Sequence, residues 1–223
     1  MRKKDDRDRA GFRAAVARSR VLLLMGTALL LTGCLDLSAE LEMNEDGSGR
    51  FELEYRLSPE SYEMAVFDRE SSYVPVPIHE DDLRRVAAGI DGLALRDYRL
   101  QRGENEFVVT AALRFDDLEA LNRFYSPGEE RIRFEQAAGT NGADTRLTVE
   151  LHPGAVGELD EDTRSFAETY LQDYRMEMRI TVPEPIRGRE NLSSGDDERS
   201  AGISASLAEL FTGDAPQRVW LEW

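Results

Sequence analysis

Cysteine and histidine are scarce in this sequence: Cys34, His79 and His152 are the only three among 223 residues. A single cysteine excludes an intramolecular disulfide. A metal site needs three or four ligands, and no pair of cysteines or histidines has ligand spacing. No glycine-rich loop that would cradle a phosphate is present either. We therefore expect neither a metal nor a cofactor.

Sequence signatures of catalysis are also missing. No Gly-x-Ser-x-Gly nucleophile elbow occurs, although a Ser/His/Asp triad assembles in space and leaves no such trace. The adjacent acids Asp81-Asp82, Asp116-Asp117 and Asp196-Asp197 point apart on a helix, so we interpret them as solvated faces or caps. We expect no catalytic residue and no enzyme, with a hydrolase built from scattered residues as the remaining alternative.

The two histidines have structural interpretations. His79 is followed by three acidic residues and is expected to cap a helix. His152 precedes Pro153 and is expected to end a strand. Neither residue is therefore a candidate for a functional site.

One segment resembles the start of a calcium loop, because Glu42, Asn44 and Asp46 alternate before Gly47. The twelfth position of such a loop is a bidentate acid, and here it is Leu53. The flanking residues also alternate as strands do. We therefore interpret the segment as a hairpin turn.

Basic residues are few after Cys34. The whole chain has 28 basic and 44 acidic residues, a net charge of −16; the segment before Cys34 has eight basic and three acidic ones, which is +5. The rest of the chain therefore carries −16 − 5 = −21. A body this acidic is a poor partner for nucleic acid, and an anionic lipid surface should repel it.

The longest uncharged apolar run, Val21–Leu31, has eleven residues. A helix needs about 20 apolar residues to span a bilayer, so this run fits the hydrophobic region of an export signal instead. It ends in Leu31-Thr32-Gly33-Cys34, which resembles the lipobox of bacterial lipoproteins. The resemblance implies removal of residues 1–33 by cleavage between Gly33 and Cys34, and attachment of lipid to the Cys34 thiol. The alternatives are an uncleaved signal anchor or an ordinary signal with a fortuitous cysteine.

Such a lipid would hold the chain at a membrane of the cell envelope, outside the cytoplasm. Each buried methylene adds about 0.8 kcal/mol, so two or three acyl chains anchor stably. Among lipoproteins that are sorted between two membranes, Asp directly after the cysteine is associated with the inner one. That position is Leu35 here, which favours the outer membrane if the host has one.

After the cysteine, the pattern predicts a β-hairpin. Apolar and polar residues alternate over 35–43 and again over 51–57, the period of half-buried strands. The intervening Asn44–Gly49 is rich in turn residues, with glycines suited to positive φ.

Further strands and helices alternate along the remaining chain. We expect helices at about 59–68, 79–89, 116–125 and 160–174, and strands at about 93–100, 106–115, 132–136, 146–151, 176–182 and 219–223. Ile203–Phe211 is either a short amphipathic helix or the end of a strand followed by a helix. The polar segment at about 187–200 should be mobile, with turns. Hairpins interleaved with helices predict one acidic α+β domain over 34–223, with a largely antiparallel sheet packed against several helices.

The order of these features resembles the LppM-type lipoproteins of the bacterial envelope. The resemblance includes the lipobox at Cys34, the first hairpin with its turn Asp46-Gly47-Ser48-Gly49, the junction Leu113–Asp117 and the strand Ile180–Pro183. It implies a compact sheet-and-helix domain, in some members with a cavity for a hydrophobic or lipid ligand. No binding residue carries over beyond the anchoring cysteine.

Three functions therefore remain as hypotheses. The membrane tether and the resemblance favour a non-enzymatic binding module for a lipid or another hydrophobic envelope molecule. The alternative is a structural or interaction subunit that docks on an envelope protein, and the hydrolase comes last. Trp220 and Trp223 are compatible with a partner-binding edge strand, although we prefer to interpret them as core anchors.

Overall fold

The computed structural model describes residues 36–59, 62, 78–125, 132–140, 145–151, 165, 169, 175–212 and 216–223. All of them belong to one unit, Leu35–Trp223. The predicted cleavage and lipid-attachment residues, Gly33 and Cys34, lie outside the described residues, as does His152. Most of the helices expected at 59–68 and 160–174 lie outside them too, so all these features stay predictions.

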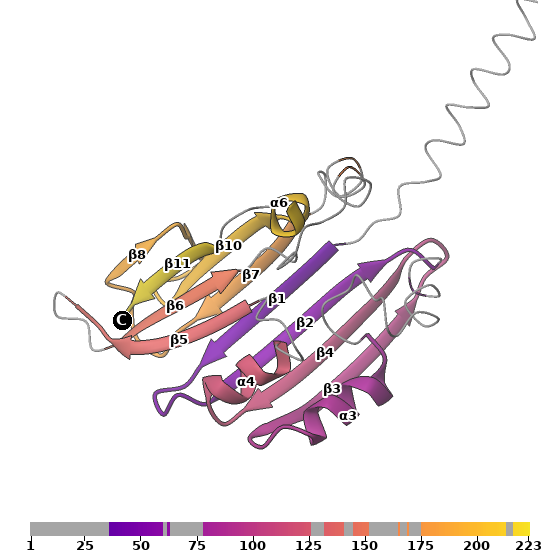
Figure 1. The fold of residues 1–223 in the computed structure, drawn as a ribbon, viewed down its shortest axis with the longest axis horizontal. Helices are drawn as coiled ribbons and strands as arrows, with labels where there is room; N and C mark the ends of the chain where they lie inside the picture. The colour runs from indigo at the N-terminus through magenta and orange to yellow at the C-terminus, as the bar shows by residue number, and fades with distance from the viewer. Residues whose placement is uncertain are drawn as a thin grey trace, which may run out of the picture. The chain divides into compact units, whose positions relative to one another are not determined.

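A seven-stranded sheet, in the order β3-β4-β2-β1-β7-β10-β9, forms the larger layer (Figure 1). Its strands are β1 Asp36–Met43, β2 Gly49–Leu57, β3 Leu93–Arg102, β4 Phe107–Phe115, β7 Arg175–Thr181, β9 Ser193–Ser194 and β10 Ser200–Ser206. Neighbouring strands are antiparallel except β1 and β7, which are parallel. The first hairpin therefore sits in the middle of the sheet.

A second, four-stranded sheet has the order β5-β6-β11-β8. Its strands, β5 Ile132–Ala138, β6 Thr145–Leu151, β8 Gly188–Glu190 and β11 Gln217–Glu222, are all antiparallel. The described helices are α3 Glu80–Ala88, α4 Leu118–Tyr125 and α6 Leu207–Thr212; α3 packs on β3, and α4 on β5 and β4. The predicted α+β class with largely antiparallel pairing is confirmed, but the strands form two sheets where one was predicted.

The hairpin of β1 and β2 forms because its turn is closed by its own side chains. The carboxylate of Asp46 accepts hydrogen bonds from the Ser48 amide at 3.0 Å and the Ser48 hydroxyl at 2.6 Å. The hydroxyl bond is the main cause that lowers the pKa of Asp46. Gly47 has φ +82°, and a Cβ on Gly49 would lie 2.4 Å from the Phe115 ring, so both positions need glycine. The predicted hairpin turn is confirmed.

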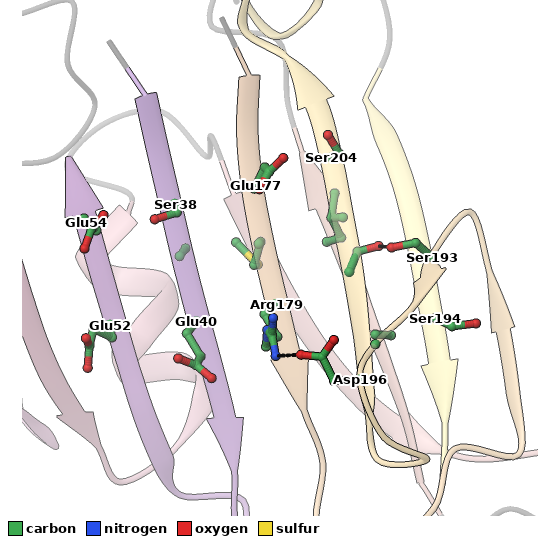
Figure 2. A pocket seen from close by; sticks show the side chains of 16 residues that line it. Ser38, Glu40, Glu52, Glu54, Glu177, Arg179, Ser193, Ser194, Asp196 and Ser204 are labelled. Atoms are coloured by element: carbon green, nitrogen blue, oxygen red, sulfur yellow. Dashed lines mark hydrogen bonds and ion pairs between the residues drawn. The ribbon is translucent and has the colours of Figure 1, made fainter. Parts of the chain in front are cut away.

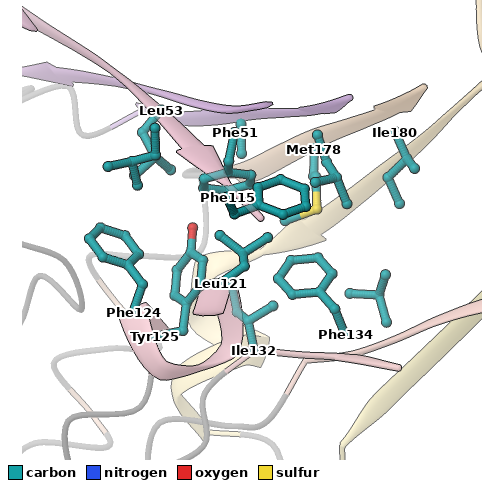
Figure 3. Packing of buried hydrophobic residues seen from close by; sticks show 14 of the residues in the cluster. Phe51, Leu53, Phe115, Leu121, Phe124, Tyr125, Ile132, Phe134, Met178 and Ile180 are labelled. Carbon is teal, nitrogen blue, oxygen red and sulfur yellow. The ribbon is translucent and has the colours of Figure 1, made fainter. Parts of the chain in front are cut away.

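Inward-facing side chains of both sheets and of α4 form one hydrophobic cluster (Figure 3). Phe51 of β2 packs edge-on against Tyr125 of α4 at 5.6 Å and against Phe134 of β5 at 6.4 Å. Phe51 and Phe134 are at most 1% exposed. Burying each such side chain contributes about 1.5–3 kcal/mol, so this cluster holds β5 and α4 over the inner face of the large sheet.

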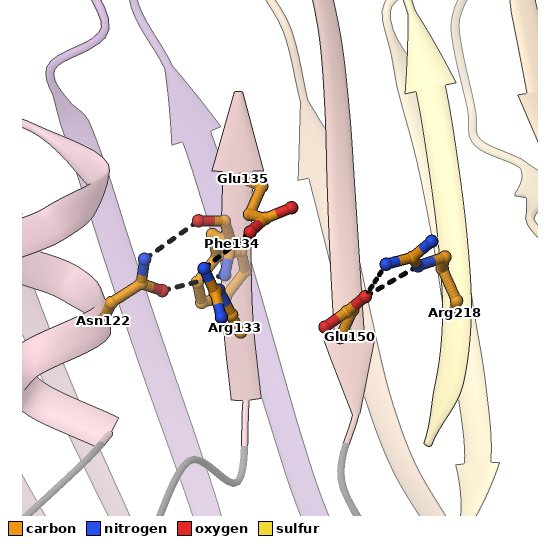
Figure 4. Close-up of polar contacts among 6 residues, drawn as sticks. All are labelled: Asn122, Arg133, Phe134, Glu135, Glu150 and Arg218. Atoms are coloured by element: carbon orange, nitrogen blue, oxygen red, sulfur yellow. Dashed lines mark hydrogen bonds and ion pairs between the residues drawn. The ribbon is translucent and has the colours of Figure 1, made fainter. Parts of the chain in front are cut away.

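Asn122 joins α4 to the edge of the smaller sheet (Figure 4). Its side-chain amide donates to the Phe134 carbonyl at 2.9 Å and accepts from the Phe134 amide at 2.8 Å. One side chain therefore pairs the outward backbone groups of β5 as a neighbouring strand would. This closes part of an edge that would otherwise be open to pairing.

The segment 187–200 contains bends and turns, as predicted, and also the short strands β8 and β9, which pair with β11 and β10. Its mobility stays a prediction. For Ile203–Phe211 the second alternative is correct, because β10 is followed by α6. The preferred interpretation as core anchors is confirmed for Trp223, which is 5% exposed, whereas Trp220 is only half-buried. The edge-strand alternative is wrong, since β11 lies between β6 and β8.

Candidate functional site

Glutamates gather on the outer face of the large sheet, opposite the hydrophobic cluster. Strand alternation turns Glu40 of β1, Glu52 of β2 and Arg179 of β7 to the same side. The strand register places Glu40 between Glu52 and Arg179. Two residues earlier in β1, on the same face, Ser38 lies between Glu54 of β2 and Glu177 of β7.

These residues line a groove of about 440 Å³ (Figure 2). We call it the acidic groove; it is lined by Ser38–Glu40, Glu52, Glu54, Glu177–Arg179, Ser193–Asp196 and Ala201–Ser204. Small side chains explain the hollow, because β10 presents Gly202 and Ser204 to this face. The Ser193 hydroxyl of β9 donates a hydrogen bond to the Gly202 carbonyl at 3.0 Å. A Cβ on residue 202 would lie 2.7 Å from the Ser193 hydroxyl oxygen. Gly202 therefore lets β9 close one side of the groove.

Most charged residues of the groove are already paired. Arg179 forms an ion pair with Asp196, and this hydrogen bond is the main reason why the pKa of Arg179 is raised. Glu52 pairs with Arg50, and Glu54 pairs with Arg56 at 2.9 Å. These three ion pairs compensate the charges of Asp196, Glu52 and Glu54.

Glu40 and Glu177 differ from these paired acids. Neither makes a hydrogen bond or an ion pair within the part of the chain that the structure describes. Glu40 also lies directly opposite Glu52, and like charges at facing positions of a sheet are unfavourable. The groove therefore presents two carboxylates from neighbouring strands that make no hydrogen bond or ion pair among the described residues, although Glu40 lies opposite Arg179. Such carboxylates suit a cationic ligand group.

The described residues contain no group of three His, Cys, Asp or Glu residues arranged to hold a metal ion. No helix among them is long and apolar enough to cross a membrane. The chemistry that the groove offers is charge pairing and hydrogen bonding, with carboxylates and serine hydroxyls as its groups.

Apart from Asp196, which lines the groove, the described residues singled out in the sequence lie elsewhere. Asp117 accepts a hydrogen bond from the Ala120 amide at 2.7 Å and so caps α4, as predicted. Asp82 pairs with Arg85 at 2.8 Å, and Asp116 with Arg114 at 2.7 Å. Each of these carboxylates is paired with an arginine, and the ion pairs do not join two carboxylates as an acid/base dyad would.

His79 occupies the N-cap position of α3, as expected, but its side chain makes no capping hydrogen bond. Instead its Nδ1 lies 3.1 Å from the Tyr62 hydroxyl, and the two rings pack edge-on at 5.0 Å. The acidic residues that follow His79, beginning with Glu80, occupy the first turn of the helix and favour its N-terminus. His79 therefore helps to attach α3 without a side-chain cap.

A second polar cluster surrounds Glu222, which is buried near the C-terminus. Its carboxylate accepts from the Thr140 hydroxyl and from Arg146 Nε, each at 2.7 Å, and Arg146 lies 4.3 Å over the Trp220 ring. The Thr140 hydroxyl is the main cause that lowers the pKa of Glu222. Because the polar groups pair with one another, this cluster stabilises the smaller sheet.

Sequence reasoning missed the acidic groove. Its residues are spread from Ser38 to Ser204, and only strand adjacency brings them together. The signal that was present is the set of glutamates at the solvent positions of three predicted strands. That signal becomes a site only once β1 is known to lie between β2 and β7.

The described residues define an α+β protein with two mostly antiparallel sheets. The sequence matches no protein-family model and no curated protein. Among solved structures, the chain is similar to the NMR structure of the folded domain of LppM from Mycobacterium tuberculosis. The identity is 12%, the match covers 85% of this chain and 89% of that chain, and the TM-score is 0.46. A similarity of this size transfers neither a ligand nor an activity.

Proposed function

We propose that this chain is a non-enzymatic bacterial lipoprotein, anchored through lipid on Cys34, which holds a basic segment of an envelope protein in the acidic groove. The anchor is supported by the sequence Leu31-Thr32-Gly33-Cys34 after the apolar run. The docking role is supported by one observation: Glu40 and Glu177, in a groove floored by small side chains, make no hydrogen bond or ion pair among the described residues.

The geometry favours an extended basic segment over a single ion. Glu40 and Glu177 are diagonal neighbours on adjacent strands, a spacing that a long cationic side chain can bridge. Small residues such as Ser38, Gly202 and Ser204 leave room beside the carboxylates for a peptide backbone. The charge of −21 after residue 33 would also accelerate the approach of a basic partner.

A hydrophobic ligand, which the sequence analysis favoured, finds less support in the described residues. Such ligands bind in mostly apolar cavities. The acidic groove is lined by carboxylates and hydroxyls, and Phe51, Tyr125 and Phe134 fill the described space between the sheets. We therefore rank the docking role first, and lipid binding stays a prediction that native mass spectrometry of the purified domain tests.

The docking role is tested with a fluorescent peptide of alternating arginine and serine, titrated into residues 35–223 at low salt. The variant Glu40→Gln/Glu177→Gln should weaken binding by at least roughly tenfold, or about 1.4 kcal/mol. The control Glu45→Gln/Glu104→Gln removes the same charge from two exposed turns and should leave affinity nearly unchanged. Equal weakening in both variants would mean that net charge alone attracts the peptide, and the groove would lose its role.

A crosslinking experiment in the host identifies the partner. A photoreactive amino acid at Ser204, on the groove floor, should yield a discrete adduct. The same group at Gln101, an exposed residue of β3, is the matched control. A docking groove predicts an adduct from Ser204 alone, and adducts of the same mass from both positions would contradict it.

The lipid anchor has its own test. Palmitate supplied to the growing cells should label the full chain, and Cys34→Ser should abolish the labelling. Mass spectrometry of the mature chain should place its first residue at position 34. Label retained in the Cys34→Ser variant would exclude this cysteine as the attachment point.

A further inference from the structure

The start of β1 determines where a lipid on Cys34 is attached relative to the large sheet, an inference that rests on the anchor proposed above. Only Leu35 separates Cys34 from Asp36, the first residue of β1. One residue spans at most about 3.6 Å, so the Cα atom of Cys34 lies within about 7 Å of that of Asp36. A tether this short leaves the domain little freedom to turn over.

The strand register shows which other parts share this end of the sheet. Leu37 pairs with Tyr55 of β2 and with Met176 of β7, close to the end of one strand and the start of the other. Next to them, Phe107 begins β4 and pairs with Arg102, the last residue of β3. We call this rim the anchor end. The opposite rim, the distal end, contains the β1–β2 turn and the junction of β4 with α4, as Figure 1 shows.

Charged residues of both signs lie at the two ends. At the anchor end, Arg56, Arg102 and Arg175 lie among Asp36, Glu104, Glu106 and, in α6, Glu209. At the distal end, Asp116 pairs with Arg114 at 2.7 Å. Charge therefore does not distinguish the two ends, and the orientation rests on the short tether at β1.

Apolar side chains accompany the arginines at the anchor end. Phe107 and Leu37 are both only partly buried, and the Arg102 guanidinium lies 6.0 Å over the Phe107 ring. A half-exposed aromatic ring beside an arginine suits a headgroup region, where an apolar body and a charged tip are both accommodated.

We propose that the domain stands upright on the membrane, with the anchor end against the lipid headgroups and β1 directed away from the bilayer. At about 3.3 Å per residue, Ser38 and Glu40 lie roughly 7 and 13 Å from the start of β1. The acidic groove therefore opens sideways, close to the headgroups. Its partner must present a basic segment near the membrane surface.

The test uses the lipidated full chain in vesicles of phosphatidylethanolamine and phosphatidylglycerol that contain a headgroup-labelled acceptor lipid. A donor fluorophore is placed at Glu104→Cys, in the anchor-end turn, or at Glu45→Cys, in the distal turn. Both positions are exposed glutamates in hairpin turns, and lipid occupies the only natural cysteine, so each variant has one reactive thiol.

Energy transfer should be strong from position 104 and much weaker from position 45. The expected difference reflects the eight residues of β1, or about 26 Å. Equal transfer from both positions would show that the sheet lies flat and overturn the orientation, as would stronger transfer from position 45. A chain that does not co-float with vesicles would overturn the anchor itself, and the orientation with it.

Discussion

The two faces of the large sheet share one backbone and differ in almost everything else. On the inner face, Leu41, Phe51 and Ile180 are completely buried. On the outer face, their neighbours Glu40 and Arg179 are exposed and line the acidic groove. Because side chains alternate, one residue of each adjacent pair serves stability and the other serves the recognition that we propose. Substitutions should therefore separate the two roles, and the experiments below are ordered from the largest expected effect to the smallest.

On the inner face, substitution of Phe51 should cause the largest loss of stability. Replacing Phe51 with alanine removes a ring that contacts Tyr125 and Phe134 and leaves a cavity between the sheets. We expect the free energy of unfolding to fall by about 3–5 kcal/mol, measured by urea denaturation. A loss below about 1 kcal/mol would mean that the two layers do not depend on this contact.

The attachment of α4 to β5 should be the next most sensitive point. Asn122→Ala leaves the amide and carbonyl of the buried Phe134 without their partners, and each unpaired group costs about 1–3 kcal/mol. We expect a total loss of about 2–4 kcal/mol in urea denaturation. Asn122→Asp keeps the acceptor for the Phe134 amide, so its stability should fall between those of the wild type and Asn122→Ala.

Figure 4 also provides the matched control for this substitution. Arg218 of β11 donates from Nε to Glu150 of β6 at 2.7 Å, but its side chain is 64% exposed. Exposed ion pairs contribute at most about 1 kcal/mol, so Arg218→Ala should cost far less than Asn122→Ala. Equal losses would contradict the claim that buried backbone groups, and not polar contacts in general, hold the edge.

The sequence predicted the parts of the fold that local pattern determines. The β1–β2 hairpin follows from alternation and from the turn around Gly47, and α4 follows from the acids before Leu118. The parallel pairing of β1 with β7 left no local trace, because it joins residues about 140 positions apart. For the same reason the division into two sheets, and with it the groove, could not be derived.

The short strands β8 and β9 were missed for a different physical reason. Their residues, Gly188–Glu190 and Ser193–Ser194, are glycine, serine and charged residues, mostly exposed and without alternation. Backbone pairing with β11 and β10 makes them strands, so tertiary context overrides their weak local preference.

Acid should weaken the turns and strand ends before it affects the inner face. Hydrogen bonds lower the pKa values of Asp46, Asp197 and Glu222 in the folded state. A carboxyl with a lowered pKa stabilises the fold above its unfolded pKa, and this contribution is lost as the pH falls through the folded value. We expect the Tm to decrease below about pH 5, and Glu222→Gln to reduce that dependence in thermal scans. A Tm independent of pH would contradict these assignments.

Tyr55 is the polar exception on the inner face. Its hydroxyl is buried, has no hydrogen-bond partner among the described residues, and burial raises its pKa. Tyr55→Phe removes an unsatisfied group and keeps the ring, so stability should rise by about 1 kcal/mol in urea denaturation. Tyr125→Phe, also on a buried ring, serves as the comparison. A loss of stability in Tyr55→Phe would reveal a partner for this hydroxyl.

On the outer face, Glu40→Gln should have the smallest effect on stability. The substitution relieves the opposition of Glu40 to Glu52 but also removes a favourable charge beside Arg179. The two effects oppose each other, and we expect a net change within about 0.5 kcal/mol in urea denaturation.

The same substitution should weaken binding of the arginine–serine peptide, as measured by fluorescence anisotropy. A residue that leaves stability unchanged and carries affinity is present for recognition, because a fold selected for stability alone would not place two glutamates face to face. If Glu40→Gln instead destabilised the domain by more than about 1 kcal/mol, its carboxylate would be structural. That result would contradict the assignment of stability to the inner face and of recognition to the outer face.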